Sequence, residues 1–168
     1  MKHRVLYYMV DGSTEAGQAA LDTIEGGDQI ELVGCAHEPN VCPTVEQLAG
    51  CEGFVGEFGP VDDACADAMA ATGMRIVSNM SIGLNHVAVE LLASHGITVT
   101  NCPGYCSDDV AQHTIALMLD LMRQVTFLNR DVRDGVWNPL AGYTMHRTQG
   151  RTLGIRQGVS FSLDDFGN

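Results

Sequence analysis

One stretch of the chain, residues 75–105, reads RIVSNMSIGLNHVAVELLASHGITVTNCPGY. It begins with a short apolar run at 75–78 and continues with a helical pattern at 86–95. It then returns to β-branched residues at 97–100. A strand, a helix and a second strand in this order predict a βαβ unit, in which the two strands run parallel.

The same alternation extends toward the amino terminus. Three further apolar runs, bounded by Gly, Asn, Asp or Pro, predict strands at 5–10, 29–35 and 53–56. Helical patterns lie between them at 13–26 and 61–72, and Asp62 and Asp63 suit the first turn of the second helix. The predicted fold class is therefore α/β, a doubly wound parallel sheet of about five strands. Ligands of such sheets bind beyond the carboxyl ends of the strands.

Turn-forming residues mark the expected ends of these elements. Asn85 is the expected N-cap of the helix at 86–95, and Gly96 is its expected stop. Four glycines surround the third strand, namely Gly50, Gly53, Gly56 and Gly59. They fit either a flexible loop or a close approach of the backbone to a ligand.

A long helix is expected after the α/β region. Ser107 is its expected cap, Asp108 and Asp109 suit its first turn, and Gly135 ends it. An apolar stripe runs through this segment, which gives about 27 residues or roughly 40 Å of helix. A helix of this length extends past the sheet, so we expect it to reach another domain or another chain.

The chain is expected to divide into three parts. Residues 1–106 form the α/β domain, residues 107–135 the long helix, and residues 136–168 a loop with the start of a further domain. In the third part, RTLGI at 151–155 is typical of a strand that opens a new βαβ unit. Residues 156–168 fit neither a glycine fingerprint nor an amphipathic helix.

The composition excludes several classes of function. The chain has 168 residues, of which 45% are hydrophobic, as in ordinary globular domains. Nine Lys and Arg stand against 21 Asp and Glu, a net charge of −12, and Lys2 is the only lysine. A phosphate loop with its lysine, a Schiff-base lysine in the core and a site for a nucleic-acid backbone are therefore excluded. Most of the acidic residues lie in 1–110.

The cysteines predict a reducing compartment. Neither an export signal nor an apolar span of about 20 residues is found in the sequence, so we expect free thiols and a cytoplasmic location. The six are Cys35, Cys42, Cys51, Cys65, Cys102 and Cys106. A metal centre would use Cys35, His37 and Cys42, but this spacing fits no standard zinc pattern, and no metal is expected.

Four motifs together resemble the D-isomer-specific 2-hydroxyacid dehydrogenases. They are SIGLNHV at 81–87, HGITVTNCPGY at 95–105, VAQHT at 110–114 and GRTLGI at 150–155. Their order and spacing match the family over residues 70–155, and the first 60 residues fit it loosely. Several linked motifs in register are a specific signal, whereas any one of them alone would be weak.

The resemblance implies a flavodoxin-like substrate domain followed by a helix that crosses into a Rossmann domain. The family transfers a hydride between NAD(H) and a 2-hydroxy or 2-keto acid. Its glycine fingerprint would follow the motif at 150–155, but 156–160 reads RQGVS here. The catalytic Arg, Glu and His of the family would lie further on, so no catalytic residue is expected among these 168. We therefore expect this chain alone to be inactive and to bind NAD(H) weakly at most.

The resemblance also implies site residues. The backbone N–H groups of Ile82 and Gly83 match those that hold the substrate carboxylate, although a tight turn would need the same residues. Asn79 stands where some members have Arg, which argues against a phosphorylated substrate. Cys106 matches a position that lines the site in formate dehydrogenases, and Val110 one that touches the cofactor or packs in the helix.

Two functions of different classes remain open at this point. The first is the substrate domain of an NAD-dependent dehydrogenase, and the second is a non-catalytic flavodoxin-like module that dimerises or binds a small acid or a protein. The apolar stripe favours a homodimer through residues 107–134. We expect the residues after Ile155 to be a frameshift product. In that case the encoding DNA should contain a G-x-G-x-x-G segment in another reading frame.

Overall fold

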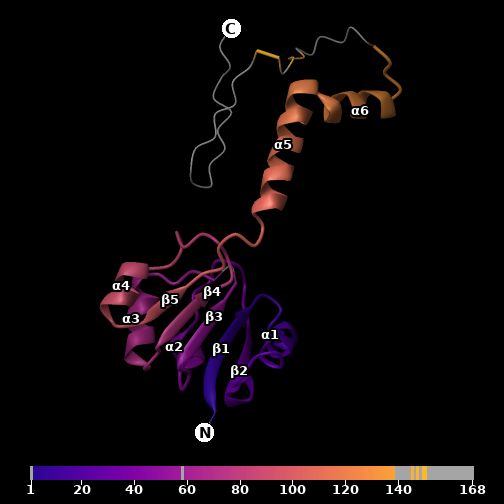
Figure 1. Ribbon diagram of the computed structural model, residues 1–168. Helices are drawn as coiled ribbons and strands as arrows, with labels where there is room; N and C mark the ends of the chain where they lie inside the picture. Colours follow the sequence, from indigo (N-terminus) through magenta and orange to yellow (C-terminus); the bar gives the residue numbers. More distant parts are fainter. Residues whose placement is uncertain (1, 58, 139–144, 146, 148, 151–168) are drawn as a thin grey trace. The chain divides into compact units, whose positions relative to one another are not determined.

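The computed structural model describes residues 2–57, 59–138, 145, 147, 149 and 150. The chain forms two compact units, Met1–Tyr105 and Cys106–Asn168 (Figure 1). The strand predicted at 151–155 and the segment at 156–168 lie outside the described residues. No helix in the described ranges is long and apolar enough to cross a membrane.

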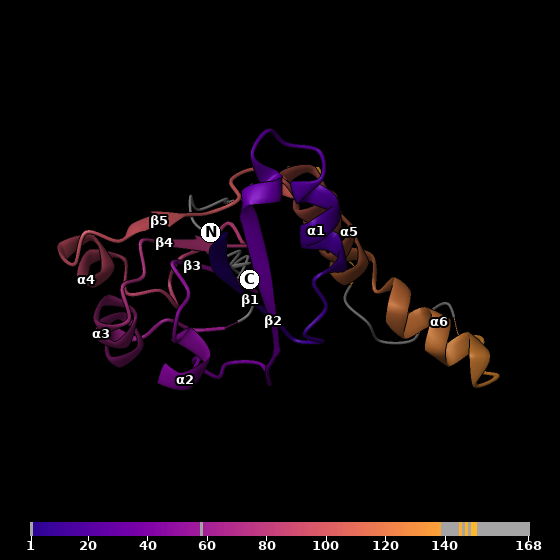
Figure 2. The same ribbon diagram turned by 90° about the horizontal axis from the view of Figure 1, so that it is seen from below.

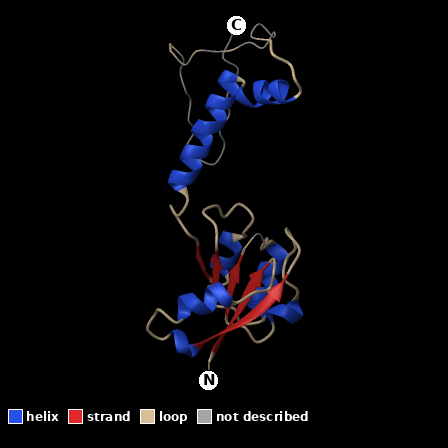
Figure 3. Cartoon of the chain, turned by 90° about the vertical axis from the view of Figure 1, so that its right-hand side faces the viewer, coloured by secondary structure: helices blue, strands red, loops and turns tan. Residues whose placement is uncertain are grey.

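The first unit is built on a five-stranded, all-parallel sheet (Figure 3). Its strands are β1 (His3–Met9), β2 (Ile30–Ala36), β3 (Gly53–Gly56), β4 (Ile76–Asn79) and β5 (Thr98–Thr100). The spatial order is β2-β1-β3-β4-β5, so the direction of winding reverses between β1 and β3. The α/β class, the parallel pairing and the five strands expected from the sequence are confirmed.

Helices cover both faces of this sheet (Figure 2). They are α1 (Glu15–Leu21), α2 (Val45–Leu48), α3 (Asp63–Ala71) and α4 (Val89–Ser94), with a 3-10 turn η1 at Gly27–Gln29. On the α1 face, Gly17 lies so close to Tyr7 and Leu32 that a Cβ atom there would meet both side chains at 2.8 Å. On the other face, Leu6 and Tyr8 join the main core, because successive residues of a strand point to opposite faces.

The main core lies between the sheet and α2, α3 and α4. Its largest fully buried side chains are Tyr8, Phe54, Leu6, Leu48, Met69, Leu92, Val61 and Val77. Two of the four glycines around β3 pack against these rings: a Cβ on Gly59 would meet Tyr8 at 2.9 Å, and one on Gly56 would strike Phe54. Close packing therefore explains Gly56 and Gly59 better than either a flexible loop or a ligand.

Two helix boundaries in this unit differ by three or more residues from the sequence-based expectation. The α4 helix begins at Val89 and its N-cap is Ala88, so Asn85 does not cap it. The reason is that 86–88 are engaged elsewhere: Val61 N donates to His86 O at 2.9 Å, and Ala88 N donates to Val61 O at 2.7 Å. The α1 helix ends at Leu21, five residues before the expected end at 26.

The second unit contains two helices where one was expected. They are α5 (Ser107–Arg123) and α6 (Val125–Arg133), and Gln124 between them has a left-handed backbone with φ 56°. The carboxylate of Asp120 accepts hydrogen bonds from the backbone N and the hydroxyl of Thr126, both at 2.8 Å. These bonds satisfy the start of α6 and stabilise the break, so a single helix over 107–134 was a wrong prediction. Ser107 is the first helical residue and Cys106 is the N-cap, with no side-chain cap.

All six cysteines are free thiols, and those in the core have altered acidity. Burial, together with smaller contributions from nearby Cys42 and Asp62, raises the pKa of Cys65 from an ordinary value of 9.0 to about 12. Burial likewise raises the pKa of Cys42 and of Cys51. Neutral thiols of this kind behave as small apolar side chains.

The N-cap of α3 is expected to contribute measurably to stability. Asp62 Oδ1 accepts a hydrogen bond from Cys65 N at 2.8 Å. Asp62→Ala should lower the free energy of unfolding by about 1 kcal/mol, and Asp62→Ser should restore most of it because a hydroxyl also caps. Urea unfolding measures both values. An alanine variant as stable as the wild type would contradict the role of the cap.

The buried thiol of Cys65 predicts a loss of stability at alkaline pH. In the unfolded chain Cys65 titrates near 9.0, whereas in the native protein its pKa is about 12. Raising the pH from 9 towards 12 therefore ionises the unfolded state first and lowers the free energy of unfolding, with no effect of this group below 9. Cys65→Ala should flatten that decline in a urea-unfolding series. Cys102→Ala, at an exposed position, should leave it unchanged; equal slopes in both variants would refute the assignment.

Candidate functional site

The candidate site is the turn that follows β4 at the carboxyl edge of the sheet. Met80 N still pairs with Gly56 O at 3.0 Å, and the chain then turns through Ser81, Ile82 and Gly83. The segment after β5 lies beside it, since Cys102 N donates to Ser81 O at 3.1 Å. This edge is where parallel α/β sheets bind their ligands.

Side chains donate hydrogen bonds to the carbonyl oxygens of this turn. Asn101 Nδ2 donates to Ile82 O at 2.8 Å. Gly83 O accepts two hydrogen bonds, one from Asn79 Nδ2 at 3.0 Å and one from Ser81 Oγ at 2.8 Å. The negative ends of two successive peptide groups are therefore bound within the protein.

The N–H groups of the same residues have no such partner. Among the described residues, no acceptor is found for the backbone N–H of Ile82 or of Gly83. The space beside Gly83 is open, because a Cβ atom built there would meet nothing within 4 Å. Ile82 is itself exposed. Two successive N–H groups without acceptors, next to carbonyl groups that are already bonded, have the polarity that suits a small anion.

Asn79 belongs to this site but lies beneath the turn. Its side chain is buried, with 3% of the residue exposed, and its amide hydrogen bonds are made within the protein. Besides Gly83 O, Nδ2 donates to Ser81 Oγ, and Oδ1 faces His86 Nε2 at 3.3 Å. The structure thus brings Asn79, Ile82 and Gly83 together, with Asn79 supporting the turn from below.

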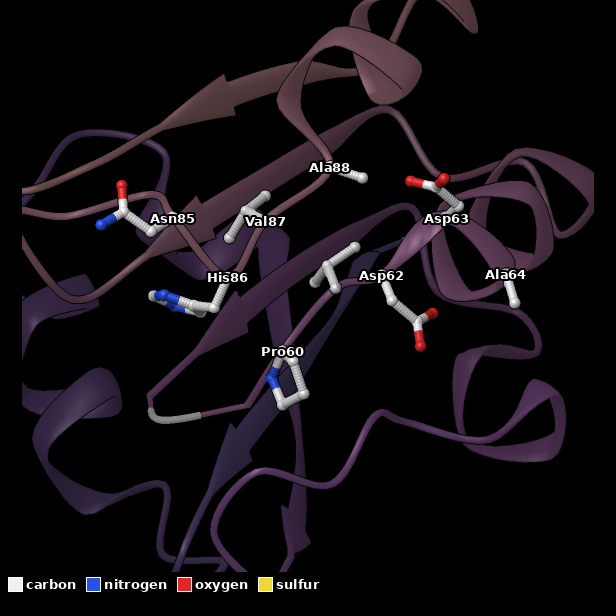
Figure 4. Close-up of a pocket in the computed structure, with 9 residues that line it drawn as sticks. Pro60, Asp62, Asp63, Ala64, Asn85, His86, Val87 and Ala88 are labelled. Atoms are coloured by element: carbon white, nitrogen blue, oxygen red, sulfur yellow. The ribbon is translucent and has the colours of Figure 1, made fainter.

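Sequence reasoning missed His86, Ser81 and Asn101. His86 is half-buried and lines an open groove of about 580 Å³ together with 60–64, Asn85, Val87 and Ala88 (Figure 4). All three residues are polar and follow the ends of β4 and β5, which is a signal that the sequence carried. Their partners are backbone carbonyls and a buried amide, which no spacing rule identifies.

The other two candidate residues lie in the second unit. Cys106 is half-buried at the start of α5, and its carbonyl accepts a hydrogen bond from Val110 N at 2.9 Å. Val110 is 43% exposed on the first turn of that helix. The described part of α5 has no buried residue, so Val110 is not a core position of this unit.

The residues considered for a metal centre have other contacts. His37 stacks on Tyr8 with ring centroids 3.9 Å apart, and Cys35 Sγ accepts a hydrogen bond from Gln47 Nε2 at 3.0 Å. Within the described ranges, no group of three His, Cys, Asp or Glu side chains is placed to hold a metal ion. Burial raises the pKa of the Tyr8 hydroxyl, which donates to Val41 O at 3.2 Å.

Comparison with known proteins identifies the relatives of this chain. Residues 10–160 match the family model of the D-isomer specific 2-hydroxyacid dehydrogenase catalytic domain. A glyoxylate reductase of Korarchaeum cryptofilum is 30% identical over 148 residues, which are 84% of this chain and 43% of the relative. A D-lactate dehydrogenase of Streptococcus agalactiae is 30% identical over 97 residues, 57% of this chain and 29% of the relative. The chain spans less than half the length of these relatives.

Solved structures show the same fold. A protein from Thermus thermophilus superimposes with a TM-score of 0.62 at 25% identity, covering 84% of this chain and 45% of that one. A D-lactate dehydrogenase from Aquifex aeolicus, solved with NAD and lactic acid, superimposes with a TM-score of 0.63 at 19% identity over 80% of this chain and 38% of that one. The five-stranded parallel sheet agrees with the family match over residues 10–160. The chain therefore belongs to the D-isomer-specific 2-hydroxyacid dehydrogenases.

Proposed function

We propose that the unit Met1–Tyr105 binds the carboxylate of a small 2-hydroxy or 2-keto acid at the turn formed by Ser81, Ile82 and Gly83. The observation that carries this proposal is the polarity of the turn: its carbonyl groups accept hydrogen bonds from side chains of the protein, and two successive N–H groups have no partner among the described residues. In this role the chain is the substrate-binding part of an NAD-dependent dehydrogenase that interconverts such acids.

The distribution of charge supports a substrate with a single carboxylate. The Lys and Arg residues of this unit are Lys2, Arg4 and Arg75. Arg4 lies at the start of β1 and Arg75 immediately before β4, at the edge of the sheet opposite the turn. Asn79 cannot replace them as a partner for a second anion, because its amide is engaged inside. A phosphate group would therefore find no cationic side chain of this unit near the turn.

The nicotinamide cofactor of the family would need a binding site of its own. In this family the hydride would pass between NAD(H) and the substrate, but the 168 residues contain no G-x-G-x-x-G sequence, and Val110 offers only an exposed apolar side chain. The described residues thus do not fit a dinucleotide by themselves. Cys106 and Val110 are proposed only as positions that border the reaction site when a nucleotide-binding domain is present.

We further propose that the chain forms a homodimer through residues 107–134. No residue of α5 or α6 is buried, and large apolar side chains such as Leu117 and Leu121 are about half exposed. Apolar surface of this extent marks an interface. The six free thiols support a cytoplasmic, reducing location for the protein.

Carboxylate binding should be visible in the amide spectrum of the purified chain. Oxamate or glycolate should give saturable ¹H–¹⁵N shifts at Ile82 and Gly83, and phosphoglycolate should bind no tighter than glycolate. Ile82→Pro removes one N–H donor and should weaken binding more than about tenfold, since a hydrogen bond to a charged group contributes 1.5–3 kcal/mol. Ile82→Val keeps the donor and is the matched control.

Two results would contradict the proposed site. One is the absence of saturable shifts at Ile82 and Gly83 in the wild type. The other is an Ile82→Pro variant that keeps the wild-type spectrum elsewhere, which shows that it folds, and still binds the acid as tightly.

The proposed dimer can be tested by light scattering. The wild type should have the mass of two chains at micromolar concentration, and Leu117→Glu with Leu121→Glu should yield monomers, because these residues lie four apart on one helix face. Gln112→Glu is a matched control, since Gln112 lies about 180° around the helix from Leu121. A monomeric wild type would overturn the proposal.

A further inference from the structure

We propose that His86, with its proton on Nε2, acts through Asn79 as a positioning residue for the turn that binds the carboxylate. This inference rests on the function proposed for Ile82 and Gly83. His86 would not touch the substrate. Its task is to fix the orientation of the buried Asn79 amide, which in turn holds the carbonyl of Gly83 away from the anion.

The hydrogen bonds determine where each proton lies. Gly83 O can only accept, so the Asn79 atom 3.0 Å from it must be the donor, Nδ2. Ser81 Oγ gives its proton to Gly83 O at 2.8 Å, so it accepts the second hydrogen bond of the Asn79 amide. Asn79 Oδ1 is therefore an acceptor, and the ring nitrogen 3.3 Å away, His86 Nε2, must carry a proton.

His86 is anchored independently of the turn. Its backbone carbonyl accepts a hydrogen bond from Val61 N at 2.9 Å, and the next residue, Val87, forms a β-bridge with Val61. Val61 is completely buried in the core. Figure 4 shows the His86 side chain beside Asn85 and Val87, on the segment that lines the groove. The backbone of His86 is thus held by the core, and its ring lies within hydrogen-bond distance of Asn79 Oδ1.

Loss of this donor would free the amide to rotate. An Asn79 side chain turned by 180° would place Oδ1 against Gly83 O, where two acceptors repel each other. Gly83 O would then lose one of its two donors, and the turn that carries the N–H groups of Ile82 and Gly83 would be held less firmly. Because Asn79 is 97% buried, water cannot easily replace the missing donor.

The first test measures the tautomer of His86 without any ligand. The ¹⁵N signals of the imidazole at a pH where it is neutral should show the proton on Nε2. In His86→Leu, the amide signals of residues 81–84 should shift while those of the strands remain in place. A proton on Nδ1, or unchanged signals at 81–84, would overturn the inference.

The second test measures oxamate affinity by titration of the same amide signals. His86→Leu should weaken binding about tenfold, the equivalent of about 1.4 kcal/mol. His86→Gln, whose amide can donate to Asn79 Oδ1, should stay within about threefold of the wild type. His95→Leu, the same change at an exposed histidine bonded to Asp67, should bind as the wild type does.

The outcomes separate a positioning role from a structural one. If His86 served only stability, His86→Leu would lower the free energy of unfolding and leave oxamate affinity at the wild-type value, which would refute the inference. Failure of the wild type to bind oxamate at Ile82 and Gly83 would refute the proposed function instead. The tautomer and the ligand-free signals of 81–84 would then still decide whether His86 fixes the turn.

Discussion

The candidate site depends on one buried amide. Asn79 ends β4 in the interior, where an unpaired polar group costs about 1–3 kcal/mol, so its donors and acceptor need partners from the protein. Those partners are Ser81, Gly83 and His86, which all belong to the segment that follows β4. Satisfying Asn79 therefore shapes the turn, and the shape of the turn leaves the N–H groups of Ile82 and Gly83 available.

The segment after the turn is fixed from a second direction. The β-bridge between Val61 and Val87 extends the contact between the β3–α3 and β4–α4 connections beyond the ends of the strands. It holds His86 in place and delays the start of α4 to Val89. The same backbone pairing thus explains the late start of the helix and the availability of His86 as a donor to Asn79.

The sequence predicted the features that local patterns determine. The five strands follow from short β-branched runs, and the turn at Ile82 and Gly83 follows from the family motif at 81–87.

The features that the sequence did not predict arise from contacts between distant segments or from side-chain hydrogen bonds. Asn85 is a good cap by residue type, but Val61 already binds the adjacent backbone. The apolar stripe runs across Gln124, and the break there is seen in the left-handed backbone of Gln124 and in the hydrogen bond that Thr126 N donates to the Asp120 carboxylate. The α2 helix has only four residues, which is too short for a helical periodicity to be recognised. Its capping box between Thr44 and Gln47 is nevertheless a signal that the sequence carried.

The small number of cationic residues in this unit bears on how it would bind an anion. In the proposed function this domain holds the carboxylate with backbone dipoles, because it has few cations and Arg4 and Arg75 lie at the far edge of its sheet. Such dipoles are weaker than a guanidinium, but they are fixed by the fold and need no reorganisation when the anion arrives. In this proposal the strength of binding depends on how rigidly the turn is held, so Asn79 and His86, which hold it, would determine the affinity. The binding groups are main-chain atoms that any sequence possesses, so the specific information lies in the residues that orient them.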